Sequence, residues 1–162
     1  MAGHGTAHLR DDDALLRVEH LVVEFPVGRT GLKVHAVTDV SLDILEGETL
    51  GIVGESGCGK STTGRAIMQL PPPRSGRVIY DGVELTTLHG EALRRVRPRL
   101  QMIFQDPISS LNPRRRVRDI VREGLDIWKI GDRASRDAKV DEVLEAVGID
   151  PVNADRRPHE FS

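Results

Sequence analysis

Cysteine, aromatic residues and long apolar runs are all scarce in this sequence. Its 162 residues include one cysteine, Cys58, which excludes an internal disulfide and favours a reducing compartment. No apolar run approaches the roughly 20 residues needed to span a bilayer. The N-terminal stretch also lacks the apolar segment of a secretory signal. We therefore expect a protein of the cytoplasm that has no membrane span of its own.

An excess of charge of either sign is also absent. Lysine and arginine number 23 and aspartate and glutamate 25, so the formal net charge is −2. This balance gives no general attraction to nucleic acid or to an anionic membrane, and we expect no nucleic-acid partner. Hydrophobic residues make up 38% of the chain, enough for the core of about one domain.

Composition and periodicity divide the chain into three parts. Residues 1–15 are small, polar and acidic, and we interpret them as a mobile tail. Residues 16–105 are dominated by strand patterns, and residues 106–162 by helical ones. The pattern thus separates a strand-rich part from a helical part.

Alternation predicts the first strands. Val18 to Phe25 suits one strand, and a second carries Val40, Leu42 and Ile44 on its inner face. Ser41 and Asp43 are expected to face outward. A hairpin is expected at 78–85, with Asp81-Gly82 as its turn.

Two short apolar runs predict buried strands further along. These are Thr49 to Val53 and Arg99 to Gln105. A helix is expected from about Lys60 to Leu70, before three prolines. Two amphipathic helices are expected at 117–128 and 136–147, the second closed by Gly148.

The most informative motif lies between the Thr49–Val53 run and the helix that follows. The segment fits the pattern G-x-x-x-x-G-K-[ST], in which a glycine-rich backbone cradles phosphates at a helix N-terminus. Lysine supplies a point charge to the β- and γ-phosphates, and the hydroxyl after it can ligate Mg²⁺. The nucleotide-binding residues predicted here are Gly54, Glu55, Ser56, Gly57, Cys58, Gly59, Lys60, Ser61 and Thr62.

Cys58 lies among these phosphate-binding groups, and two interpretations of it remain open. Backbone N–H groups and a nearby lysine would lower a thiol pKa and make an exposed cysteine reactive. Alternatively, cysteine is simply a small residue that fits the loop.

Three segments together resemble a known family. GESGCGKST at 54–62, QMIFQDPISSLNPR at 101–114 and RRPHEFS at 156–162 are similar to the ATP-binding proteins of the oligopeptide and dipeptide importer group of ABC transporters, which includes nickel importers. The resemblance covers about residues 16–162. It implies an α/β fold, in which a P-loop NTPase core of the ABC type has antiparallel edge strands and a partial helical subdomain.

The resemblance also implies roles and partners. Gln105 would contact Mg²⁺ and the attacking water, and Phe25 would stack on adenine. ATP and Mg²⁺ are the implied cofactors, and Lys60 and Gln105 the implied catalytic residues. The implied partners are transmembrane permease subunits and a second ATP-binding subunit, with the protein peripheral at the inner face of the membrane. Without the resemblance, Phe25 could equally be a core residue, and Gln105 could be a polar residue that ends a strand.

In that family a signature follows the position of Phe161, and a strand ending in Asp-Glu and a histidine come later. We therefore expect this sequence to be a fragment that binds ATP with little turnover. Two alternatives remain: a P-loop kinase, against which FQDP at 104–107 argues, and a nucleotide-binding module without turnover.

Eight arginines lie between Arg94 and Arg118, with Asp106 as the one acidic residue among them. The run suits either an interface with a membrane subunit or nucleotide, or the solvated face of ordinary helices. Nothing in the sequence separates these two interpretations.

Overall fold

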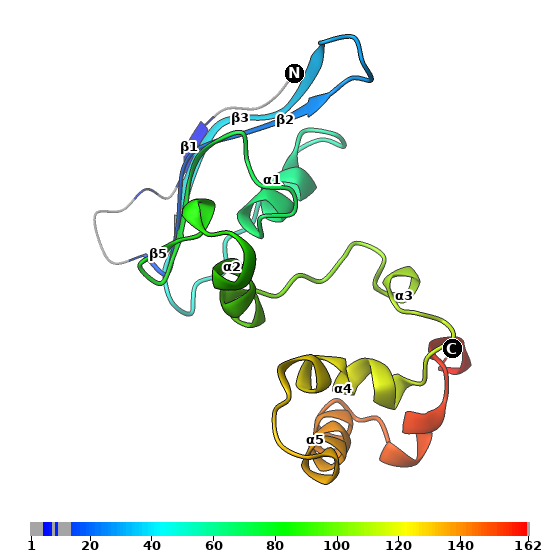
Figure 1. The fold of residues 1–162 in the computed structure, drawn as a ribbon. Coiled ribbons are helices and arrows are strands. Elements are labelled where there is room, and N and C mark those ends of the chain that lie inside the picture. Colours follow the sequence, from blue (N-terminus) through cyan, green and yellow to red (C-terminus); the bar gives the residue numbers. More distant parts are fainter. Residues whose placement is uncertain (1–4, 8, 10–13, 162) are drawn as a thin grey trace. The chain divides into compact units, whose positions relative to one another are not determined.

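The structure is a computed structural model that describes residues 5–7, 9 and 14–161. The chain forms two compact units, Met1–Gln101 and Met102–Ser162 (Figure 1). The division falls a few residues before the boundary predicted at 105/106. Each unit is described by itself below.

The first unit is built on a five-stranded sheet with the order β1-β3-β2-β4-β5. Strand β3 pairs in parallel with β1, and the other neighbours are antiparallel. The fold is therefore α/β with antiparallel strands, as predicted. The strands are β1 (Gly5–Ala7), β2 (Leu16–Pro26), β3 (Lys33–Ile44), β4 (Ser75–Tyr80) and β5 (Val83–Glu84).

Strand β1 falls within the segment predicted to be a mobile tail. Residues 5–7 pair with Val40–Leu42, and much of the rest of 1–15 lies outside the described residues. The tail stays a prediction for those residues. Strand β3 begins at Lys33, well before the predicted Val40, so β2 and β3 form one long hairpin.

Helix α1 (Lys60–Ile67) packs on one face of the β2–β3 hairpin (Figure 1). Ala66 joins the sheet residues in a fully buried cluster, because the apolar face of a sheet needs a covering layer. The buried members of this cluster are Val18, Leu21, Val23, Val37, Leu42, Ala66, Val78 and Leu85.

Two residues predicted to face outward are in fact buried. Ser41 is 5% exposed and Asp43 is 1% exposed. Both have polar partners that offset the cost of burial: Ser41 Oγ accepts a hydrogen bond from His20 N–H at 2.9 Å, and Asp43 accepts one from Arg17 Nε at 3.2 Å. Alternation identified the two faces, but it could not identify these partners.

The two apolar runs predicted as buried strands have no strand structure here. The residues from Thr49 to Val53 and from Gln101 to Phe104 are irregular, and Val53 and Ile103 are 96% and 89% exposed. A strand is defined by its ladder partner, and among the described residues none is paired with either run. The apolar composition was therefore insufficient to predict the local structure.

The predicted hairpin at 78–85 is present. Strands β4 and β5 pair across Asp81-Gly82, and both turn residues have positive φ, 49° and 73°. This is the backbone that an Asp-Gly turn favours between two strands. A 3-10 turn (Leu85–Thr87), helix α2 (Gly90–Val96) and a second 3-10 turn (Arg97–Arg99) complete the first unit.

The second unit is helical. Its elements are α3 (Pro107–Ser110), α4 (Val117–Trp128), α5 (Arg133–Ala146) and two 3-10 turns, Pro151–Asp155 and Pro158–Glu160. The core is small, with Val140, Leu144 and Ala154 as its buried members. Gly148 (φ 77°) ends α5 as predicted: Ile149 N–H donates to Leu144 O at 2.9 Å.

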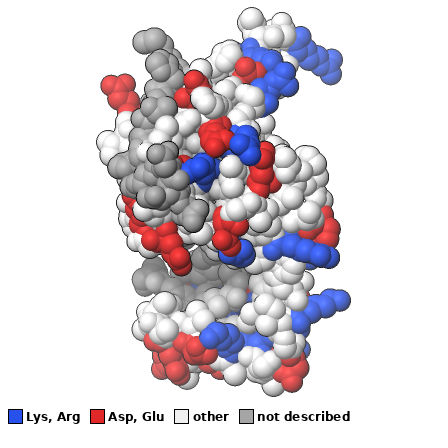
Figure 2. Space-filling view, turned by 90° about the vertical axis from the view of Figure 1, so that its left-hand side faces the viewer, with Lys and Arg blue, Asp and Glu red and all other residues white. Residues whose placement is uncertain are grey.

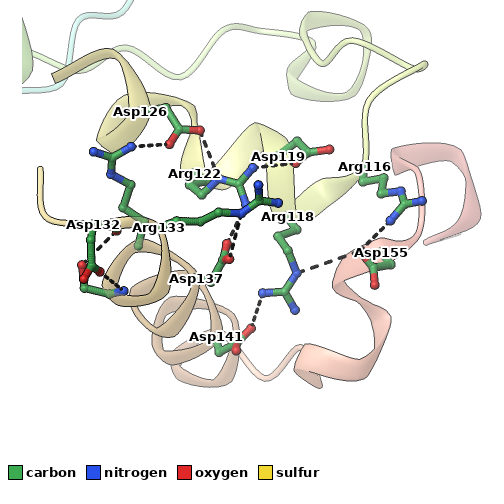
Figure 3. Close-up of polar contacts among 12 residues, drawn as sticks. Arg116, Arg118, Asp119, Arg122, Asp126, Asp132, Arg133, Asp137, Asp141 and Asp155 are labelled. Carbon is green, nitrogen blue, oxygen red and sulfur yellow. Dashed lines mark hydrogen bonds and ion pairs between the residues drawn. The ribbon is translucent and has the colours of Figure 1, made fainter. Parts of the chain in front are cut away.

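Ion pairs join the elements of this second unit (Figure 3). Arg122 on α4 donates to Asp137 of α5 at 2.5 Å and to Asp119 and Asp126 of its own helix at 3.0 Å each. Its side chain is only 14% exposed. The hydrogen bond to Asp137, followed by that to Asp126, raises the pKa of Arg122 above its usual value. Arg118 links the same helix to Asp141 at 2.8 Å.

Candidate functional site

The glycine-rich loop occupies residues 54–59 and leads directly into α1. Gly57 and Gly59 have φ values of 82° and 99°, a left-handed backbone that favours glycine. Cys58 N–H donates to Glu55 O at 3.4 Å, which closes a turn within the loop. The backbone thus curls in the way that the motif predicts, and two of its glycines are needed for that curl.

Gly59 is fixed by a second constraint besides its φ. A Cβ atom at this position would overlap the carbonyl oxygen of Ala36 and lie 3.4 Å from Val37 Cγ2. Any side chain would therefore push the loop away from β3. This close approach seats the end of the loop against the β2–β3 hairpin and sets where α1 begins.

Lys60 folds back across the loop. Its Nζ donates to Gly54 O at 2.7 Å and to Glu55 O at 2.6 Å, and lies 3.6 Å from Cys58 Sγ. A single ammonium group is thus held at the mouth of the loop by backbone carbonyls. The predicted contact of Lys60 with phosphates stays a prediction.

The first turn of α1 supplies more polar groups at the same end of the loop. The first helical hydrogen bond runs from Thr63 N–H to Gly59 O at 2.8 Å. The N–H groups before it have no partner inside the helix, and the helix dipole adds positive partial charge there. Ser61 is exposed at this end, so its hydroxyl can reach a ligand, and Thr62 follows half-buried.

Cys58 is half-buried between its two neighbouring glycines. Its Sγ faces both Lys60 Nζ and the position where a Cβ of Gly54 would be, 2.7 Å away. The small side chain therefore fills space between Gly54 and Lys60. This packing agrees with the simpler interpretation of Cys58, as a residue that fits the loop.

Phe25 lies beyond the core on the same hairpin that Gly59 contacts. It is 39% exposed, so it is not a core residue, and it pairs across the hairpin with Val34. The sequence did not lead us to Val34, because the second strand was predicted only from Val40 onward. The alternation of Val34 and Ala36 with His35 was the signal that could have extended the strand.

Gln105 belongs to the second unit, whereas the glycine-rich loop belongs to the first. Its side chain is exposed, and it directly precedes Asp106, whose carboxylate accepts from Ser109 N–H at 3.1 Å at the start of α3. The role of Gln105 toward Mg²⁺ and water therefore stays a prediction.

The arginine run from 94 to 118 is divided between the two units. Most of its members pair with carboxylates: Arg94 and Arg95 with Glu91, Arg99 with Asp81, and Arg116 and Arg118 with Asp155. On the face seen in Figure 2, basic and acidic side chains are likewise interspersed. These pairings favour the solvated-face interpretation of the run.

The family resemblance implies an Asp-Glu pair at the end of a strand. The sequence contains one Asp-Glu dipeptide, Asp141-Glu142. It lies within α5, where Asp141 accepts a hydrogen bond from Arg118 and Glu142 accepts one from Lys139 at 2.6 Å.

No cluster of three metal-binding side chains occurs among residues 5–7, 9 and 14–161. In the same part of the chain, no helix has the length and apolarity to cross a membrane.

Comparison with known proteins gives a consistent result. The family described as ABC transporter matches residues 37–162. An oligopeptide transport ATP-binding protein, OppF of Bacillus subtilis, is 48% identical over 155 residues, which are 93% of this chain and 49% of that protein. A glutathione import ATP-binding protein, GsiA of Pectobacterium atrosepticum, is 45% identical and is covered over 25% of its length.

Solved structures agree with the sequence comparison. A dimeric post-hydrolysis state of the ATP-binding cassette MJ0796, bound to ADP and Pi, superposes with a TM-score of 0.76 at 25% identity. The match covers 91% of this chain and 63% of that one. The chain thus spans about half the length of OppF and about a quarter of GsiA.

Proposed function

We propose, from the premise that this chain belongs to the ABC transporter family, that it is the nucleotide-binding part of a transport ATPase for peptides or a similar small solute. The observation that carries the proposal is the loop at 54–61. Its glycines curl, its lysine lies at the mouth, and a helix begins at its end. Peptide and glutathione transport, named for the relatives, suggest the solute class.

The residues of the loop fit a triphosphate. The absence of a Cβ on Gly59 lets the loop lie close against Ala36 and Val37 of β3, and the left-handed backbone at Gly57 and Gly59 lets successive N–H groups converge on anionic oxygens. Lys60 exchanges the carbonyls of Gly54 and Glu55 for phosphate oxygens, which are stronger partners because they carry charge. Lys60 thereby holds the β- and γ-phosphates and neutralises part of their charge.

Mg²⁺ fits the same end of the loop. The Ser61 hydroxyl is a hard oxygen ligand, and Mg²⁺ in such sites takes few protein ligands because substrate phosphates supply others. When bound, Mg²⁺ stabilises negative charge on the transferring phosphoryl group. Gln105, by the family resemblance, orients the water. Phe25 lies on the hairpin that Gly59 contacts and stacks on the base.

The partners and location proposed are those of an importer ATP-binding subunit. Two such subunits pair, as in the dimeric cassette that superposes on this chain, and permease subunits hold them at the inner face of the membrane. The mixed charge of the surface supports protein partners rather than nucleic acid. Co-purification of this chain with co-expressed permease subunits tests this part, and failure to co-purify would contradict it.

Binding is tested by calorimetry with Mg-ATP. Lys60→Ala is expected to weaken binding at least ~10-fold, about 1.4 kcal/mol, because a charge-assisted phosphate contact is lost. Lys139→Ala is the matched control: this lysine pairs with Glu142 on α5, and its removal should leave the affinity unchanged. Equal affinities for the wild type and Lys60→Ala would contradict the proposal.

We further propose that residues 1–162 alone bind ATP with only trace turnover. The Asp-Glu dipeptide of this sequence is ion-paired within α5 rather than placed after a strand. A group that positions or deprotonates water typically contributes 10² to 10⁴-fold to the rate. Phosphate release is the measurement, with Lys60→Ala reporting contamination. Lys60-dependent turnover near ~1 per second would refute this point.

A further inference from the structure

Helix α1 has a hydroxyl group on its buried face. Thr63 and Ala66 are the buried residues of this helix, and of the two only Thr63 has a polar side chain. Threonine is a poorer helix former than alanine, and a buried hydroxyl costs free energy unless it is hydrogen-bonded. Here the Thr63 Oγ1 donates to Gly59 O at 3.0 Å. The hydroxyl is therefore committed to the residue that ends the glycine-rich loop.

The carbonyl of Gly59 accepts two hydrogen bonds from Thr63. One comes from the Thr63 N–H at 2.8 Å and the other from its hydroxyl. The peptide bond between Gly59 and Lys60 is trans, so its C=O and N–H groups point in opposite directions. Because the carbonyl is held along the helix, the Lys60 N–H points out of the helix N-terminus, the end at which the glycine-rich loop lies.

Gly59 is also held on its other side, by β3. A Cβ atom on Gly59 would overlap Ala36 O, so the Gly59 Cα lies directly against the strand. Its backbone has φ 99° and ψ 0°, and glycine leaves this conformation more readily than a residue with a side chain confined to one region would. Ala36 thus limits where Gly59 lies, whereas Thr63 limits the direction in which its carbonyl points.

We propose that Thr63 is a positioning residue for phosphate binding: through Gly59 O, its hydroxyl keeps the Lys60 N–H directed at the phosphates. This inference rests on the proposed function, because it requires phosphates to bind at the loop. Without the hydroxyl, Gly59 O keeps one hydrogen bond, and the Gly59–Lys60 peptide spends part of its time rotated. A rotated peptide presents a carbonyl oxygen to the anion instead of an N–H. The apparent affinity then falls in proportion to the fraction of chains whose peptide is in the binding orientation.

The experiment measures the affinities of residues 1–162 for Mg-ATP and Mg-tripolyphosphate by calorimetry. Thr63→Val removes the hydroxyl at nearly constant volume, and Thr63→Ser keeps the hydroxyl but removes the methyl group. Thr63→Val is expected to weaken both ligands by the same factor, about 3-fold to 10-fold, since tripolyphosphate has no base and the effect acts on phosphates. Thr63→Ser should bind both ligands as the wild type does.

Stability gives a second measurement that separates positioning from a purely structural role. Thr63→Ser deletes a buried methyl group, so hydrogen exchange of β2 and β3 amides should show a loss of protection, while Thr63→Val should stay close to the wild type. Affinity is thus expected to follow the hydroxyl and stability the methyl group. A purely structural role would place the variants in the same order in both measurements. If Thr63→Val does not fold, Thr63→Ser and Thr63→Ala, which differ only in the hydroxyl, decide the point.

Thr87→Val is the matched control. The Thr87 hydroxyl also donates to a backbone carbonyl, that of Glu84 at 2.9 Å, but in the 3-10 turn after β5. Its removal should leave both affinities unchanged. The inference is overturned if Thr63→Val binds tripolyphosphate like the wild type, or if Thr63→Ser binds as weakly as Thr63→Val. In both cases a wild type that binds Mg-ATP through Lys60 leaves the proposed function standing. A wild type that binds neither ligand contradicts the proposed function and this inference together.

Discussion

The two units of this chain are stabilised in different ways. In the sheet unit, residues far apart in sequence meet in one apolar cluster, with Leu21, Val18 and Val78 fully buried. In the helical unit the buried apolar residues are Val140, Leu144 and Ala154, and arginine–aspartate pairs connect the elements. The sheet unit therefore depends mainly on the hydrophobic effect, and the helical unit more on charge.

This difference is relevant to function. The glycine-rich loop belongs to the sheet unit, where Gly59 lies close against Ala36 and Val37 of β3, so its shape depends on contacts between uncharged groups that salt does not screen. Gln105 lies in the other unit, where stability depends on charges that salt does screen. Conditions that leave the loop intact can thus loosen the unit that contains Gln105.

The largest expected effect comes from the core of the sheet unit. Leu21→Ala should lower the free energy of unfolding of that unit by about 2–5 kcal/mol, because it removes buried methyl groups and leaves a cavity. Hydrogen exchange resolves the units separately: amides of β2 and β3 should lose protection, while those of α4 and α5 should not. Equal loss in both units would mean that they unfold together, and the comparison would fail.

The sequence predicted those parts of the fold whose determinants are local. The glycine-rich loop, the Asp81-Gly82 turn and the end of α5 at Gly148 each depend on a few neighbouring residues with a required φ. Their local structure could therefore be predicted without knowing what they pack against. The α/β class followed from the family resemblance that the loop and two other segments carry.

Features that depend on distant partners were not predictable. The runs at 49–53 and 101–104 have the composition of buried strands, but composition does not say which strand lies beside them. Asp43 was predicted to face solvent because polar and apolar residues alternate along its strand, yet it is buried and accepts a hydrogen bond from Arg17 of β2. Val34 was missed as a neighbour of Phe25 because the second strand was predicted only from Val40, so no strand partner was assigned to Phe25.

A smaller effect tests whether ion pairs stabilise the helical unit. Arg122→Ala is expected to destabilise the helical unit by about 1–2 kcal/mol, because it leaves Asp119, Asp126 and Asp137 without their shared cation. Arg133→Ala is the control: this arginine is 85% exposed and 3.9 Å from Asp137, so the change should be close to zero. Denaturant titration of α4 and α5 amides by hydrogen exchange provides the measurement.

Salt sharpens the same test. Raising ionic strength to about 1 M shortens the Debye length to roughly 3 Å, so the wild-type helical unit should lose stability while Arg122→Ala loses less. The sheet unit should change little under the same conditions. If salt weakened Arg122→Ala as much as the wild type, Arg122 would not be the group through which charge stabilises this unit.

The smallest effect concerns the start of α5. Asp132 caps this helix by accepting hydrogen bonds from Ser135 N–H at 2.8 Å, and that backbone bond holds the pKa of Asp132 below its usual value. Because the folded pKa is depressed, the stabilisation is complete at pH values above the usual pKa of an aspartate. It is lost as the pH falls through the lowered pKa of the folded state. The pKa of Asp126 shifts in the same direction, since the hydrogen bond from Arg122 lowers it.

Acid should therefore loosen α5 before it loosens β2, and hydrogen exchange measured from neutral pH down to about pH 3 would detect this. Asp132→Asn keeps a capping oxygen but cannot titrate, so its α5 should be slightly less stable at neutral pH and less sensitive to acid. An α5 that responds to acid equally in the wild type and Asp132→Asn would show that the cap does not cause the pH dependence, and that the other ion pairs of the helical unit do.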